Sequence, residues 1–289
     1  MSNEKFWFET NKELWNQRTI VHKDSAFYDL QGFKEGKSVL TPIEVHEVGD
    51  VSGKTMLHLQ CHFGMDSLNW SRLGATVTGI DLSDVAIDEA RKLNDELGLN
   101  AKFICCNVYD LHPDNAESSQ VSPLGGDLEG AAFDIVFTSY GTIGWLPDLN
   151  KWAEIISYYL KPGGLFYIAE FHPVVWMFDE EFTHVKYYYD NREVIVTENE
   201  GTYTDRNANI KGKEYGWNHS ISEVINSLIK NGLQIRLFNE HMYSPYPCFR
   251  NTVETEKARP DDPVGRGKWE IKGMEGKIPM LYSLKATKV

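Results

Sequence analysis

The sequence predicts an α/β fold in which seven strands form an open, mostly parallel sheet with helices on both faces and an antiparallel last strand. Two observations predict this class. From residue 54, short apolar runs alternate with amphipathic stretches, which is the pattern of successive β–α–β units. Several of the amphipathic stretches also begin or end at residues that suit helix caps. Ligands of such a sheet bind outside the carboxyl ends of the strands, so residues just after each strand are candidates for a site.

Seven apolar runs are expected to form the strands. Five come first and are connected mainly by stretches with a helical pattern, and the last two could pair antiparallel at one end of the sheet. In chain order the runs are Thr55–Leu59, Thr76–Ile80, Lys102–Cys105, Phe133–Thr138, Leu165–Ala169, Gln234–Asn239 and Met280–Ala286.

Four amphipathic stretches are expected to form helices. Three of them begin at a residue that suits an N-cap, namely Ser83, Asp148 or Ser220. Glycine follows two of them, where many helices end with a left-handed residue, and the third stops at the turn Lys161-Pro162-Gly163-Gly164. The four ranges are Met65–Leu73, Ser83–Leu97, Leu149–Leu160 and Ile221–Ile229.

The chain is expected to hold one main domain, residues 41–289, preceded by a helical cap, residues 1–40, in which Trp7, Trp15 and Tyr28 follow a partly helical pattern. Three insertions interrupt the regular alternation. Residues 112–132 read as a polar surface loop, and residues 251–279 as a charged excursion between the last two strands. The insertion 184–217 contains a hairpin over residues 184–204 that is expected to turn at Asp190-Asn191.

The composition disfavours several partners. With 29 basic and 42 acidic residues the formal charge is −13, so the chain lacks the positive field that a nucleic-acid backbone requires. No apolar run approaches the ~20 residues that cross a bilayer, and the N-terminus is acidic where a signal peptide is basic. The four cysteines form no disulfide framework and no zinc-type pair. We therefore expect a cytoplasmic protein with no nucleic-acid partner, no membrane partner and no metal.

Five short segments fall at successive strand ends: Leu57–Gly64, Gly79–Ser83, Asn107-Val108, Phe133–Phe137 and Leu160–Gly164. In their order and spacing they resemble the class I S-adenosylmethionine-dependent methyltransferases, over roughly residues 50 to 240. The resemblance implies a Rossmann-like fold, S-adenosyl-L-methionine as cofactor with S-adenosyl-L-homocysteine as product, and in-line methyl transfer to a small-molecule acceptor.

Asp81 is the first candidate for binding the cofactor. It stands at the tip of the second predicted strand, directly after Ile80, and lies 17 residues after Gly64, close to the ~20 that separate the glycine-rich turn from the acid that binds ribose. A carboxylate at this place can accept two hydrogen bonds from a ribose diol. Leu82 follows it within the same segment. The alternative is that Asp81 serves only the start of the helix beside Ser83.

The turn after the first strand departs from the family's pattern of an acidic residue followed by Gly-x-Gly-x-Gly. His58 stands in place of the acid, Gln60 and His62 stand in place of two glycines, Cys61 lies between them, and only Gly64 is retained. A residue with a Cβ fits such a turn if its φ is negative, but it narrows the space beside the ligand. The departure leaves room for a subgroup in which the side chain of Gln60 or His62 meets the amino-acid end of the cofactor.

The resemblance implies roles for four further residues. Asn107 stands where the family has an acceptor for the adenine amino group, and Val108 would pack on the adenine ring. The alternative is that Asn107 caps its own turn. Ser139 would offer its backbone carbonyl to the cofactor's amine, and Tyr140 would form an aromatic wall near the positive sulfur.

Methyl transfer from a sulfonium chiefly requires alignment of the nucleophile and exclusion of water. His172 and His219 are candidate bases, because an imidazole with an ordinary pKa of ~6.5 can accept a proton at neutral pH. The alternative is that each histidine only forms a hydrogen bond with a loop carbonyl. The other residues expected on the acceptor side are Trp145, Glu170, Phe171, Trp176 and Trp217.

The N-terminal helical segment would fold over the cofactor, with Arg18 pairing the methionine carboxylate in a charge-assisted bond. The alternative is a surface helix anchored by Trp15. Together with the predicted hairpin, this segment would form a lid over a closed chamber, which suits a small acceptor better than a protein or an RNA.

Two other functions stay open. One is a protein that binds the cofactor without transferring the methyl group. The other, less favoured, is an NAD(P)-dependent oxidoreductase, which needs a Gly-x-Gly-x-x-Gly turn where residues 60–64 supply one glycine. A metal at His58, Cys61 and His62 is disfavoured because these residues straddle a strand and its turn. The sequence leaves the acceptor atom and the oligomeric state open.

Overall fold

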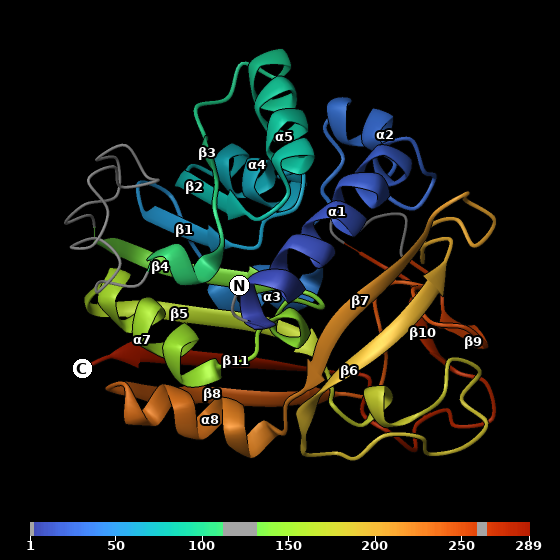
Figure 1. The fold of residues 1–289 in the computed structure, drawn as a ribbon. Helices are drawn as coiled ribbons and strands as arrows, with labels where there is room; N and C mark the ends of the chain where they lie inside the picture. The colour runs from blue at the N-terminus through green and yellow to red at the C-terminus, as the bar shows by residue number, and fades with distance from the viewer. Residues whose placement is uncertain (1–2, 112–131, 259–264) are drawn as a thin grey trace.

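The computed structural model describes residues 3–111, 132–258 and 265–289. Its centre is a seven-stranded sheet in the order β3-β2-β1-β4-β5-β11-β8 (Figure 1). Neighbours from β3 to β5 are parallel, whereas β11 is antiparallel to both β5 and β8. The predicted fold class is therefore confirmed. The strands are β1 Thr55–Leu59, β2 Thr76–Asp81, β3 Lys102–Cys105, β4 Phe133–Ser139, β5 Leu160–Phe171, β8 Leu233–His241 and β11 Leu281–Lys288.

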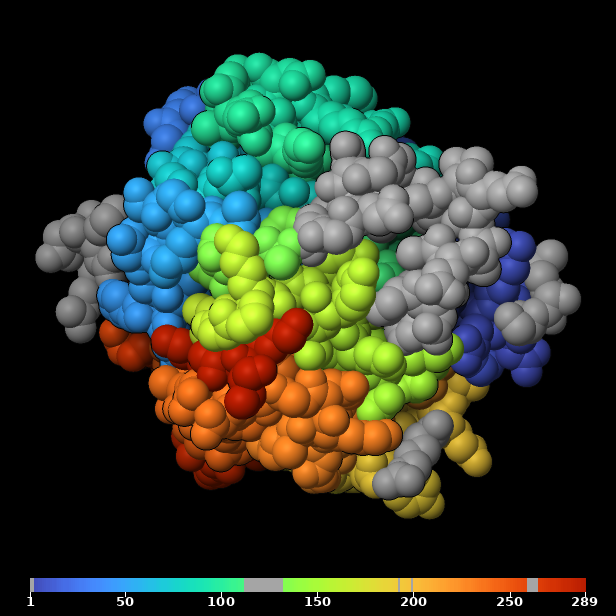
Figure 2. Space-filling view, turned by 90° about the vertical axis from the view of Figure 1, so that its left-hand side faces the viewer, coloured from blue at the N-terminus to red at the C-terminus, as the bar shows by residue number. Residues whose placement is uncertain are grey.

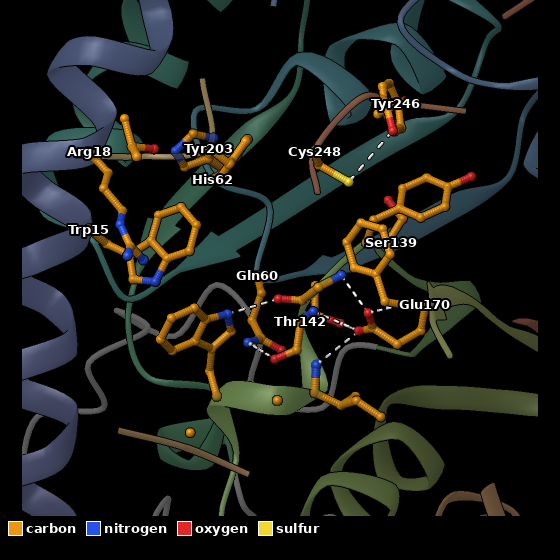
Figure 3. Close-up of a pocket in the computed structure, with 18 of the residues that line it drawn as sticks. Trp15, Arg18, Gln60, His62, Ser139, Thr142, Glu170, Tyr203, Tyr246 and Cys248 are labelled. Carbon is orange, nitrogen blue, oxygen red and sulfur yellow. Dashed lines mark hydrogen bonds between the residues drawn. The ribbon is translucent and has the colours of Figure 1, made fainter. Parts of the chain in front are cut away.

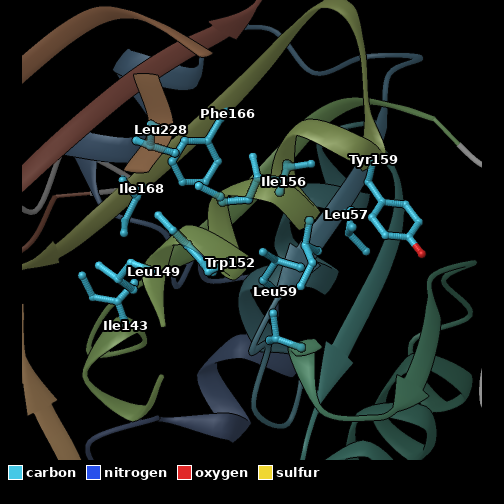
Figure 4. Packing of buried hydrophobic residues seen from close by; sticks show 14 of the residues in the cluster. Leu57, Leu59, Ile143, Leu149, Trp152, Ile156, Tyr159, Phe166, Ile168 and Leu228 are labelled. Atoms are coloured by element: carbon cyan, nitrogen blue, oxygen red, sulfur yellow. The ribbon is translucent and has the colours of Figure 1, made fainter. Parts of the chain in front are cut away.

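Successive side chains along each strand point to opposite faces of the sheet, and each face has its own hydrophobic core. In β1, Met56 belongs to the core under helices α4 and α5, whereas Leu57 and Leu59 belong to the core under α7 and α8. Trp152 of α7 lies fully buried in the second core, against Phe166 of β5 (Figure 4). The helices are α3 Pro42–Val48, α4 Met65–Arg72, α5 Asp84–Glu96, α7 Leu149–Tyr159 and α8 Ile221–Lys230.

The predicted helix starts are confirmed by their caps. The Ser83 hydroxyl accepts from the Ala86 N–H, and the Asp148 carboxylate accepts from two N–H groups in the first turn of α7. The Ser220 hydroxyl accepts from the Glu223 N–H. Helix α7 ends at Tyr159, just before the predicted turn, but residues 161–164 already lie within the range of β5.

Two helices occupy the N-terminal segment: α1 Asn3–Lys23 and α2 Leu30–Lys34. Helix α1 packs along strand β7, where Asn11 exchanges two hydrogen bonds with the backbone of Tyr215, at 2.8 and 2.9 Å. Figure 1 shows α1 and the β6–β7 hairpin at the same end of the sheet. Figure 2 shows the opposite end, where α8 and the end of the C-terminal strand form part of the surface.

The predicted position of the hairpin is wrong. The hairpin consists of β6 Asn191–Glu200 and β7 Lys211–Asn218, so Asp190-Asn191 lies at its beginning and not at its turn. The chain reverses after β6 because Gly201 adopts a φ of +70° and the Thr202 N–H donates to the Asp205 carbonyl.

The other two insertions differ in what can be said of them. Residues 251–279 hold a short antiparallel pair, β9 Thr252–Glu256 with β10 Lys268–Ile271. The predicted loop 112–132 lies, except for residue 132, outside the described residues. The remaining elements within the described residues are three short 3₁₀ helices, η1 Val108–Leu111, η2 Ile143–Trp145 and η3 Val175–Met177.

Candidate functional site

A cavity of about 810 Å³ lies at the carboxyl ends of the parallel strands. Its size falls within the ~300–1,000 Å³ of typical small-molecule sites. Residues that follow successive strands line it, and α1 and the hairpin supply the opposite wall (Figure 3). The lining from the strand ends includes Gln60 after β1, Asp81 at the end of β2, Asn107 after β3, Ser139 at the end of β4 and Glu170 in β5.

The turn after β1 keeps a glycine-like backbone although two of its residues carry side chains. Gln60 and His62 have φ values of +56° and +52°, so the negative φ that the sequence required of such residues is not found. A left-handed residue with a Cβ costs roughly 1–2 kcal/mol. The turn is held by the Gln60 side chain, which donates to the Thr142 carbonyl at 2.9 Å, and by the His62 N–H. Figure 3 shows the Gln60 bond.

Asp81 lines the cavity at the end of β2, the position that the sequence predicted for it. One carboxylate oxygen accepts from the His62 N–H and the other from the Ser83 N–H, both at 2.8 Å. Burial raises the pKa of Asp81 to about 6. Each ionised oxygen can accept a further hydrogen bond, so a diol in the cavity can be bound while the helix start stays satisfied.

The adenine side of the predicted site also lines the cavity. Leu82, Asn107 and Val108 are all part of the wall, and Val108 is buried. The Asn107 side-chain oxygen accepts from the Tyr109 N–H at 3.0 Å, which is the turn-capping alternative. The same oxygen has a second acceptor position, so the turn bond does not prevent a bond to a ligand.

Tyr140 presents its ring to the cavity and directs its hydroxyl away to a buried acid. The hydroxyl donates to the Glu44 carboxylate and lies 3.0 Å from the Thr41 hydroxyl. Burial raises the pKa of Glu44 to about 7 and that of Tyr140 well above its usual value. This arrangement suits an aromatic wall and leaves no free hydroxyl for proton transfer.

Glu170 stabilises the loop that follows β4. Its two carboxylate oxygens accept from the N–H groups of Gly141, Thr142 and Ile143, at 2.5, 2.6 and 3.1 Å. Burial raises the pKa of Glu170, and these bonds oppose the rise. Because its acceptor positions are used within the loop, Glu170 shapes the cavity and is not available as a base.

The two candidate bases do not present a free nitrogen to the cavity. His172 is outside the lining: one ring nitrogen lies 3.0 Å from the Glu240 carboxylate, and the other accepts from the Val174 N–H. This position corrects the expectation that His172 faces the acceptor. His219 lines the cavity, but its nitrogens lie 2.8 Å from the Leu146 carbonyl and 3.0 Å from the Glu223 carboxylate.

Arg18 belongs to α1, and its side chain forms part of the cavity wall. Its guanidinium donates to the Glu214 carboxylate at 2.8 Å and lies 5.2 Å from the ring centre of Trp15 (Figure 3). Its Nε is buried and has no partner among the described residues. Pairing with a cofactor carboxylate would therefore use that nitrogen or compete with Glu214.

The structure adds residues to the site that the sequence did not predict. Asp66, in the first turn of α4, lines the cavity and accepts from the Ser139 hydroxyl at 3.3 Å. Its position two residues after Gly64 was the available signal. Tyr203 comes from the hairpin turn and Tyr246 from the segment after β8, and no motif marks either one (Figure 3).

In the described ranges 3–111, 132–258 and 265–289, no group of three or more His, Cys, Asp or Glu residues is arranged to hold a metal ion. Within the same ranges, no helix combines the length and the apolar character needed to cross a membrane.

Residues 57–166 match the family model described as a methyltransferase domain. The chain is 24% identical over 149 residues to a ubiquinone biosynthesis O-methyltransferase of Shewanella pealeana, covering 50% of this chain and 57% of that relative. It is 26% identical over 148 residues to the protein of that name from Xanthomonas axonopodis pv. citri, covering 50% and 56%. The chain thus matches little more than half the length of these curated relatives.

Solved structures show a shared fold. An S-adenosylmethionine dependent methyltransferase from Mesorhizobium loti has a TM-score of 0.54 at 19% identity, covering 86% of this chain and 96% of that chain. A second, from Clostridium acetobutylicum, has a TM-score of 0.52 at 13% identity, covering 93% and 94%. Residues 57–166 therefore match a methyltransferase domain, and the chain as a whole shares the fold of these S-adenosylmethionine-dependent methyltransferases.

Proposed function

We propose that the protein is an enzyme that transfers a methyl group from S-adenosyl-L-methionine to a small-molecule acceptor. The observation that carries this proposal is Asp81, whose carboxylate lies in the wall of a large cavity, at the end of β2, with acceptor capacity left on both oxygens. A ribose diol is the group that this geometry fits best.

The order of the strands gives the cofactor a direction. With its ribose at Asp81, the adenine would lie toward Val108 after β3, and the amino-acid end would lie over β1 and β4. The half of the cofactor that carries the sulfur would then contact the backbone of the turn at residues 60–64. It would also contact the side chain of Gln60 and residue Ser139. The cofactor supplies an activated methyl group on a sulfonium.

The rest of the cavity supports a small acceptor. Its wall beyond β4 is largely aromatic and includes Tyr140, Phe171, Trp176 and Phe249, with ring centres 4.9–6.3 Å apart along the series. Helix α1 and the hairpin would act as the lid that excludes water. A protein or a nucleic acid would need an open groove in place of this enclosed wall.

Positioning would then account for the rate more than proton transfer. The candidate groups Tyr140, His172 and His219 all direct their polar atoms to other protein groups. The ring of Tyr140 would lie near the sulfonium, where an aromatic face favours positive charge. Aligning the acceptor and excluding water are the contributions that this wall can make.

The structure disfavours a dinucleotide in the same cavity. A pyrophosphate would bind at the start of the helix after β1, where Asp66 carries a carboxylate into the first turn. Asp66 would repel the phosphate charge. We also propose a cytoplasmic location, which the four free cysteines of the chain support.

Titration calorimetry tests the cofactor. S-adenosylhomocysteine should bind the wild type, and Asp81→Ala should weaken binding at least tenfold, since it removes two hydrogen bonds to a charged group. A screen of small metabolites with radiolabelled methyl donor then tests transfer. Binding without any methylated product would favour a binding protein, and NADPH binding without S-adenosylhomocysteine binding would overturn the proposal.

A further inference from the structure

We propose that Asp66 binds the ammonium group at the amino-acid end of the cofactor, an inference that rests on the function proposed above. It makes Asp66 a residue that selects for a ligand with a cationic amine, in a turn where residue 58 is a histidine. The inference stands on the contacts of Asp66, its place in the sheet and the state of His58.

Asp66 is the least satisfied carboxylate in this part of the wall. Its one hydrogen bond within the described residues comes from the Ser139 hydroxyl, at 3.3 Å. Asp81 accepts from two backbone N–H groups at 2.8 Å, and Glu170 accepts from backbone donors through both oxygens. Arg266, which also lines the cavity, acts on Asp66 through its charge, but no ion pair between the two within 4.0 Å is found in the described part of the chain. A cationic donor would satisfy the oxygens that are left.

Asp66 lies where the amino-acid end of the ligand must extend. The cofactor's ribose separates its adenine from its sulfur, so adenine toward β3 requires the sulfur side to lie over β1 and β4. These two strands are neighbours, with Leu57 opposite Val136. Asp66 follows β1 and Ser139 ends β4, so their bond closes the wall between the two strand ends.

His58 brings no charge to this place. It is buried at 1% exposure, and one ring nitrogen lies 2.7 Å from the Ser67 hydroxyl of α4. Burial lowers the pKa of His58 to about 3, so the ring is neutral near pH 7. The negative charge near this turn therefore lies eight residues later, on Asp66 in the first turn of α4, whose pKa burial raises to about 6.

Three ligands separate the parts of the cofactor. S-adenosylhomocysteine carries the amine and the carboxylate, its desamino analogue keeps only the carboxylate, and 5′-methylthioadenosine lacks both. By calorimetry at pH 7.5, the wild type should prefer S-adenosylhomocysteine to the desamino analogue. Asp66→Asn should weaken S-adenosylhomocysteine by about tenfold to a hundredfold and change the other two ligands less than threefold, because only the first carries the cation.

Two variants serve as matched controls. Asp81→Asn should weaken all three ligands, since all three carry the ribose. Asp50→Asn removes an exposed carboxylate that accepts from the Ser52 N–H and should change none. Asp66→Ser repeats the loss of charge with a residue that also suits a helix start, and thermal unfolding of each variant shows whether it folds.

The outcomes are distinct. If the wild type binds none of the three ligands, the proposed function fails and the inference falls with it. If the wild type binds them but Asp66→Asn and Asp66→Ser leave the preference for the amine unchanged, the inference alone is overturned. The same holds if methyl transfer is lost while S-adenosylhomocysteine binds normally, since Asp66 would then act on the acceptor.

Discussion

At the scale of single residues, the most informative side chain is Asp81, because its protonation state should control ligand binding. Burial raises its pKa to about 6, so the carboxyl gains a proton as the pH falls through 6 and loses acceptor capacity for a ribose diol. The affinity for 5′-methylthioadenosine, which involves no ammonium, should therefore fall about tenfold for each pH unit below 6. Asp81→Asn should bind weakly with little pH dependence between pH 5 and 7, and a pH-independent wild type would contradict this.

Gln60 and His62 mark the limit of residue-level prediction. The sequence indicates that they replace two glycines, but it cannot indicate that both keep the left-handed backbone, at φ +56° and +52°. That conformation depends on long-range partners: Asp81 accepts the His62 N–H, and Thr142 accepts the Gln60 amide. The Gln60 side-chain oxygen is buried with no partner among the described residues, which fits the prediction that its side chain meets the ligand.

At the scale of elements, local patterns predicted what depends on local contacts. The predicted bounds of β1 and β3 are those observed, and the capped helices begin within one residue of their predicted starts. The hairpin was misplaced because its turn depends on Gly201 and a backbone bond at Asp205, whereas Asp190-Asn191 only resembles a turn. The pairing of α1 with β7 was not predictable either, since Asn11 and Tyr215 are 204 residues apart.

The pairing of α1 with β7 gives a prediction about the cavity wall that α1 and the hairpin form. Asn11→Ala removes both hydrogen bonds to Tyr215 and leaves its half-buried carbonyl and N–H without these partners. The free energy of unfolding should fall by about 1–3 kcal/mol, and S-adenosylhomocysteine should dissociate faster because α1 covers the site. Urea unfolding and stopped-flow tryptophan fluorescence measure the two effects. Thr10→Ala, on the exposed side of α1, is the matched control and should change neither; equal effects of both variants would contradict the role of this contact.

At the scale of the whole molecule, the cavity unites groups that no single motif contains. The parallel strands end within two residues of their predicted ends, and because a parallel sheet brings these ends to one edge, Gln60, Asp81, Asn107 and Ser139 all line the cavity. The base candidates failed for another reason: whether a histidine faces a cavity depends on partners such as Glu240 for His172, which comes from a distant strand. The residues that contact the acceptor depend on such distant partners, so the sequence alone predicts the chemistry of the acceptor least well.

Burying so many titratable groups at one site makes the stability of the whole fold depend on pH in two opposing ways. The acids Glu44 and Asp81 have pKa values raised to about 7 and 6, so stability falls as the pH rises from about 4 through those values. The histidines His22, His58 and His62 have pKa values lowered to about 2, 3 and 3, so stability falls as the pH drops below about 6.5.

Because these slopes oppose each other, a single variant can separate them. Glu44→Gln removes one group that holds a proton more tightly in the folded state than in the unfolded state. Relative to the wild type, the free energy of unfolding of this variant should therefore rise with pH between 5 and 6.5, by up to ~1.4 kcal/mol per pH unit. Urea unfolding of both proteins at pH 5, 5.75 and 6.5 measures the difference. A constant difference across this range would mean that Glu44 is ionised throughout and that Tyr140 donates to a permanent carboxylate, in which case the polar support beneath the aromatic wall is a fixed charge and not a titrating one.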